Sequence, residues 1–81
     1  MAHTVAFKLS NVPGVTPANR TIIENEIKAR LLVMLEQGTK LTHGDDRVYE
    51  MFNEIVNRLL LSNVRLTSPY YTLTVDGVQL N

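Results

Sequence analysis

The chain has 81 residues, of which 44% are hydrophobic and 20% are charged, and its 8 basic and 8 acidic residues give no net charge. This length favours one domain covering residues 1–81, and the charge balance excludes a general electrostatic attraction to nucleic acid or to an anionic membrane. Because there is no cysteine, the sequence excludes disulfides, thiolate zinc sites and cysteine nucleophiles.

The first predicted element is a strand over residues 5–9, where apolar and polar side chains alternate. Thr16 and Pro17 then favour the start of a helix, because the threonine oxygen can accept free helical N–H groups and proline is tolerated at the first helical position. We expect this helix to run over residues 17–37, with Gly38 as its C-terminal stop.

A second helix is predicted over residues 46–61, with Asp45 or Asp46 as its N-terminal cap. Its apolar side chains fall within one arc of the helix, which is typical of a helix that packs one face against a core. Three oppositely charged pairs four residues apart would add weak ion pairs on the helix flanks: Glu24–Lys28, Glu26–Arg30 and Glu54–Arg58.

Alternation with period two returns over residues 64–67 and 71–75, which predicts two further strands, and residues 78–80 can add a short last one. The order β-α-α-β-β predicts an α+β fold. We expect a two-layer sandwich in which a small antiparallel or mixed three-stranded sheet carries both helices on one face. The side chains expected to point from the sheet toward the helices are Val5, Phe7, Leu9, Val64, Leu66, Tyr71, Leu73 and Val75.

The first helix carries two apolar stripes on roughly opposite sides. The stripe expected to face the sheet runs from Ile23 to Leu35. Four apolar residues with two charged flanking residues form the second: Ile22, Glu26, Ala29, Arg30, Leu32 and Val33. A two-layer monomer can bury only one of these faces, and an exposed apolar stripe rimmed by charge often marks an interface. The alternative is that loops or the C-terminal segment cover it.

We therefore expect the second stripe to bind a protein partner, either a second copy in a homodimer or a host protein. The small Ala29 would let two helices approach closely, and Glu26 and Arg30 could form ion pairs across a two-fold axis. The absence of net charge removes repulsion between copies.

No motif for catalysis, for a metal or for a cofactor stands out. We therefore expect a protein that is not an enzyme and that binds no metal and no cofactor. His43, Asp45, Asp46 and Glu50 could supply metal ligands, but aspartates at a helix start are accounted for by capping. The four glycines are scattered and form no phosphate-binding loop.

The alternative function is nucleic-acid binding by the open face of the sheet. Lys8, Arg65 and Tyr70 could lie there beside several threonines, and sheets that bind single strands combine basic groups with stacking aromatic rings. Only one aromatic residue is expected on this face, and the charge is balanced, so we favour protein binding.

The N-terminus shows no basic segment followed by an apolar one, as a signal peptide would have. The longest apolar run, residues 31–35, is too short to span a bilayer. With the absence of cysteine, these features lead us to expect a cytoplasmic protein that does not enter a membrane.

The opening reads Met1-Ala2-x-Thr4-x-x-Phe7-Lys8-x-Ser10. Together with two helices and a terminal β segment, it resembles a family of small early proteins of T7-like bacteriophages. The resemblance covers the first ten residues by identity and the rest by element order. It implies a viral protein that acts in the bacterial cytoplasm without catalysis, binding the host nucleoid-structuring protein and relieving its silencing of phage genes. It carries no functional residue over to this chain.

Overall fold

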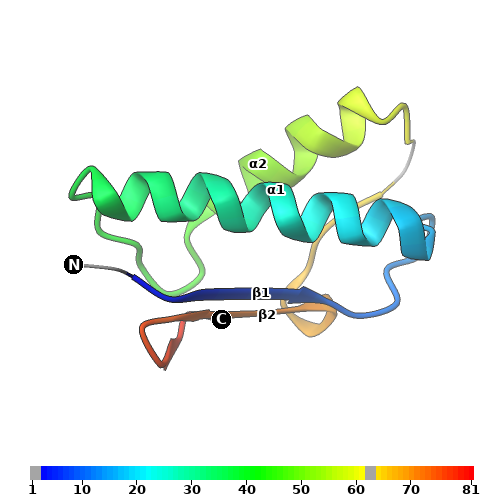
Figure 1. The fold of residues 1–81 in the computed structure, drawn as a ribbon. Helices are drawn as coiled ribbons and strands as arrows, with labels where there is room; N and C mark the ends of the chain where they lie inside the picture. The colour runs from blue at the N-terminus through cyan, green and yellow to red at the C-terminus, as the bar shows by residue number, and fades with distance from the viewer. Residues whose placement is uncertain (1–2, 62–63) are drawn as a thin grey trace.

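Two helices lie on one side of a small antiparallel sheet in the computed structural model, which describes residues 3–61 and 64–81 (Figure 1). The sequence-based prediction of a two-layer α+β fold is confirmed. The elements in chain order are β1 (Val5–Leu9), α1 (Pro17–Glu36), α2 (Asp46–Arg58), a short 3₁₀ turn (Ser68–Tyr70), β2 (Tyr71–Val75) and β3 (Val78–Gln79).

The central strand of the sheet is β2, which pairs antiparallel with β1 on one side and with β3 on the other. Val5 lies opposite Val75 and Leu9 lies opposite Tyr71. Both strands bury every second side chain, as their alternating sequences predict. The buried side chains point toward the helices, and the other face of the sheet is open.

The strand predicted over residues 64–67 is not formed, so the third strand is β3 and not this segment. Val64 and Leu66 are nevertheless buried, with 8% and 7% of their surface exposed. The described part of the segment therefore alternates because one side packs on the core. The places on both sides of β2 are taken by β1 and β3, and residues 64–67 lie outside the sheet.

The helix starts follow the predicted capping. Thr16 Oγ1 accepts a hydrogen bond from the Asn19 N–H at 3.2 Å, and Pro17 occupies the first helical position. Of the two candidate caps for α2, Asp45 has this role, since its Oδ1 accepts the Arg47 N–H at 3.0 Å.

The second helix ends at Arg58, three residues earlier than predicted. The Leu60 N–H donates to Asn57 O at 3.1 Å, and the Leu61 N–H donates to Val56 O at 3.0 Å. These two bonds form a Schellman motif, in which one residue after the helix takes the left-handed conformation. Here that residue is Leu60, with a φ of 59°.

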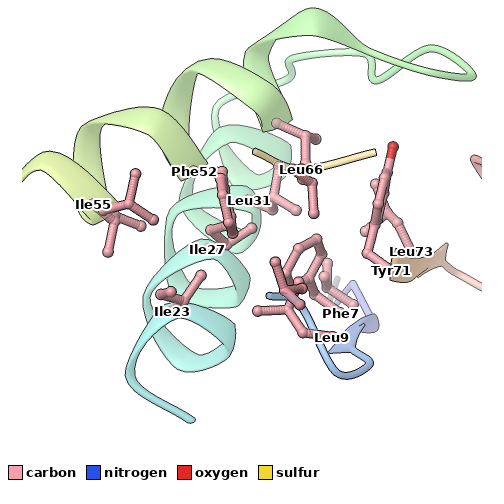
Figure 2. Packing of buried hydrophobic residues seen from close by; sticks show 14 of the residues in the cluster. Phe7, Leu9, Ile23, Ile27, Leu31, Phe52, Ile55, Leu66, Tyr71 and Leu73 are labelled. Atoms are coloured by element: carbon pink, nitrogen blue, oxygen red, sulfur yellow. The ribbon is translucent and has the colours of Figure 1, made fainter. Parts of the chain in front are cut away.

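The core lies between the layers. Figure 2 shows side chains from α1, α2, β1 and β2 meeting there, together with Leu66 from the connecting segment. Ile27 of α1 and Phe52 of α2 are fully buried. At the margin, the hydroxyl groups of Tyr49 and Tyr71 lie 3.0 Å apart, which links α2 to the sheet through a polar contact.

Two side chains complete the hydrogen bonding at the edges of the sheet. The predicted Glu24–Lys28 pair is replaced by a different contact: Glu24 Oε2 accepts the Leu9 N–H of the edge strand β1 at 2.7 Å. Beyond β3, the Asn81 amide acts like a further peptide group. Its Oδ1 accepts the Leu73 N–H at 3.0 Å, and its Nδ2 donates to Tyr71 O at 2.6 Å.

Candidate protein-interaction surface

An apolar hollow lies between the two helices. It has a volume of about 370 Å³ and is lined by Ala29, Arg30, Val33, Met34 and Met51. The first four residues belong to α1, and Met51 comes from the middle of α2. We call this feature the interhelical groove.

Three residues of the predicted second stripe remain exposed. Ile22 and Val33 have 44% and 51% of their surface exposed, and Ala29 between them is also exposed. They follow one line along α1 at spacings of seven and four, on the side opposite the fully buried Ile27. Leu32 differs, because it is half-buried and packs against the core. The exposed stripe therefore consists of Ile22, Ala29 and Val33.

The charged residues that flank the stripe join the two helices of one molecule. The predicted pair of Glu26 and Arg30 forms at 3.4 Å. Arg30 also reaches Glu54 on α2 at 3.0 Å, and Arg58 of α2 pairs with Glu26. The predicted Glu54–Arg58 pair is thus replaced by two pairs between the helices. We call these four residues the charge quartet.

The quartet has two positive and two negative members, so the rim of the interhelical groove carries no net charge. The Arg58 guanidinium lowers the pKa of Glu26, and Arg30 lowers the pKa of Glu54. Both carboxylates therefore stay ionised at neutral pH, and the groove is an apolar hollow beside a neutral rim. Such a surface suits an apolar protein side chain better than a charged ligand.

The residues proposed for nucleic-acid binding differ in how exposed they are. Lys8 is exposed and lines a hollow of about 150 Å³ with Pro69 and Thr72. Arg65 is exposed on the segment before the 3₁₀ turn. Tyr70 is half-buried and packs against the core, so its ring offers less area for stacking on a base.

Of the candidate metal ligands near the start of α2, Asp45 has structural partners. Asp45 is buried, and both of its oxygens accept hydrogen bonds from the Arg47 side chain, at 2.9 and 2.7 Å. Within residues 3–61 and 64–81, no three histidine or acidic residues gather as metal ligands would. In the same ranges, no helix combines the length and apolar character needed to cross a membrane.

A third hollow lies at the C-terminal end of α1. It has a volume of about 480 Å³, and its lining includes Leu35, Val75 and Val78. At its margin His3 Nδ1 lies 2.8 Å from Asp76 Oδ2. The long separation of these segments in the sequence explains why no local pattern indicated the hollow.

Comparisons with protein-family models, with curated proteins and with solved structures find no match to this chain. The geometry of the described surfaces therefore carries the functional proposal.

Proposed function

We propose that this chain is a non-enzymatic protein-interaction module, and that its first partner is a second copy of itself. The contact surface is the exposed stripe of α1 with the neighbouring interhelical groove. The observation that carries the proposal is the exposure of Ile22 and Val33 beside an apolar hollow. An apolar surface of this kind on a small domain is stabilised when a partner covers it.

The stripe suits contact between two identical helices. Ala29 is small and lies between the two larger residues, so the helix backbones can approach closely at the centre. Glu26 and Arg30 are already paired with α2, so we now place them at the rim, in place of the ion pairs expected across the axis. A two-fold arrangement would bring each stripe against its copy.

The stripe alone supports weak binding. Ile22 and Val33 are about half exposed, so covering each contributes about 1 kcal/mol, and two copies together gain about 4 kcal/mol. Association opposes this with at least about 4 kcal/mol of lost translational and rotational freedom. A stable dimer therefore needs further apolar contacts beyond the stripe.

Sedimentation of the parent chain and of Val33→Glu tests the proposal. We expect the parent to dimerise at tens of micromolar, roughly the range of weak dimers, and Val33→Glu to remain monomeric. Thr72→Glu is the matched control, since it adds the same charge at an exposed position on the open face of the sheet, away from the helices, and should leave dimerisation intact. A monomeric parent, or a Val33→Glu variant that still dimerises, would refute the proposal.

The N-terminal resemblance to the phage family adds a host protein as a competing occupant of the same stripe. A pull-down from bacterial lysate, with and without nuclease, separates this from the alternative function. A host protein that stays bound after nuclease treatment and is lost with Val33→Glu supports the stripe. Retention of DNA or RNA that falls steeply with salt would favour nucleic-acid binding through Lys8 and Arg65.

A further inference from the structure

Leu60 lies just beyond α2 with 91% of its surface exposed, the highest value among the exposed large hydrophobic residues described. It also has a φ of 59°, in the left-handed region where side chains other than glycine and asparagine are strained. Its backbone is held in this conformation by the hydrogen bonds that close α2.

Both features are unfavourable in the monomer. Glycine would adopt this backbone conformation without strain and would expose no apolar side chain. At 91% exposure, the leucine gains little from packing within its own chain. A strained backbone position that also exposes an apolar side chain points to a contact outside the molecule.

We propose that Leu60 of one copy inserts into the interhelical groove of a second copy, reciprocally across a two-fold axis. This inference rests on the self-association proposed above and names the contact that the stripe alone lacks. Each chain carries one protruding aliphatic side chain and one apolar hollow, so two copies can satisfy both features in one closed interface.

The groove fits this occupant in size and charge. Its volume of about 370 Å³ is roughly twelve times the 30 Å³ share of one water molecule, which leaves room for a leucine side chain. Four of its five lining residues are apolar, and its two methionines adapt to the shape of their neighbours. The fifth, Arg30, is paired with Glu26 and Glu54. Arg58 precedes Leu60 closely but is paired with Glu26, so insertion brings no unpaired charge toward the hollow.

The same groove residues connect the two proposals. Val33 belongs both to the exposed stripe and to the lining of the groove. A dimer in which the stripes meet therefore also covers the groove, and Leu60 adds two apolar anchors to that interface. Covering Leu60, which is exposed almost in full in the monomer, removes further apolar surface from water in each copy.

Leu60→Gly separates this inference from a merely structural role of the leucine, because stability and association should change in opposite directions. At concentrations where the chain is monomeric, the variant should raise Tm by about 3–5 °C through relief of strain. In sedimentation, its dimer dissociation constant should rise roughly 100-fold, since two anchors are lost per dimer. Leu60→Asn, which also tolerates the left-handed conformation, should show the same weakening.

Two results would overturn the inference. The first is a Leu60→Gly variant that is more stable but dimerises like the parent, while Val33→Glu still abolishes dimerisation. The self-association proposal would then stand and only the role of Leu60 would fail. The second is a parent that stays monomeric at every concentration, which would refute both.

Discussion

Asp45 organises the connection between the two helices, and replacing it offers the sharpest test of how this small fold is stabilised. The carboxylate accepts the Arg47 N–H as the cap of α2. It also accepts hydrogen bonds from the Thr42 N–H at 3.0 Å and from the Arg47 guanidinium at 2.9 and 2.7 Å. Only 7% of the residue is exposed, so little water could replace these bonds in Asp45→Ala.

The expected loss follows from these contacts. Removing a helix N-cap costs about 1 kcal/mol, and losing the bond to the Thr42 N–H costs about 0.5–1 kcal/mol. The ion pair with Arg47 contributes about 1 kcal/mol after allowance for solvent screening, because that side chain is 40% exposed. We therefore expect Asp45→Ala to lower the free energy of unfolding by about 2–3 kcal/mol, a large share of the stability of a small domain.

Urea denaturation followed by circular dichroism measures this change. Asp46→Ala is the matched control, since Asp46 is the exposed neighbour in the first turn of α2 and should cost less than about 1 kcal/mol. If both variants lose the same stability, the hydrogen-bond network does not stabilise the fold as argued.

The pH dependence provides a second check. The Arg47 guanidinium holds the pKa of Asp45 well below its usual range, against the opposing effect of burial. Because the folded-state pKa is lowered, the contribution is complete above the unfolded pKa of about 3.9 and is lost as the pH falls below it. The stability difference between the parent and Asp45→Asn should therefore narrow below pH 4. A difference that stays constant from pH 7 to pH 3 would contradict this assignment.

Three further substitutions test the core, the charge quartet and the sheet edge. Phe52→Ala removes a fully buried ring and should lower the free energy of unfolding by about 3–5 kcal/mol, seen as a large drop in Tm; a shift of only a degree or two would contradict the packing described. Glu54→Gln breaks an exposed pair with Arg30 and should change stability by less than about 1 kcal/mol, so a larger loss in thermal melting would show that the quartet holds the helices together. Asn81→Ala removes both the acceptor of the Leu73 N–H and the donor to Tyr71 O and should cost about 1–2 kcal/mol, with faster hydrogen exchange at the Leu73 amide; unchanged exchange would argue against the amide contact.

The periodicity of the sequence predicted most of the fold. The alternation of apolar and polar side chains located β1 and β2. The helical spacing of apolar residues located both helices, and the Thr16 cap located the start of α1. The prediction over residues 64–67 was wrong because alternation reports one-sided burial, which an extended segment can reach without pairing with a strand. The end of α2 was placed too late, since the residues up to Leu61 are apolar and give no local stop signal.

The candidate surface was predicted in part. A helical projection placed Ile22, Ala29 and Val33 together, and the structure keeps them exposed. The helical projection of α1 could not show that Met51 of α2 completes a groove, because tertiary packing sets how the two helices pair. For the same reason, spacing along one helix predicted a pair within α2, whereas Arg58 finds its partner on α1. The strain at Leu60 depends on a backbone angle, which the residue type does not indicate.

The hydrogen bond from the Leu9 N–H to the Glu24 carboxylate affects how the edge of the sheet can pair with other chains. The Ser10 N–H donates to Tyr70 O and the Asp76 N–H donates to Thr4 O, so the alternate residues of β1 direct their backbone groups outward. With the amide of Leu9 occupied, less of the outer edge of β1 is free to pair with a strand of another chain. Glu24 therefore covers part of the free edge of β1, a feature that discourages edge-to-edge pairing between chains.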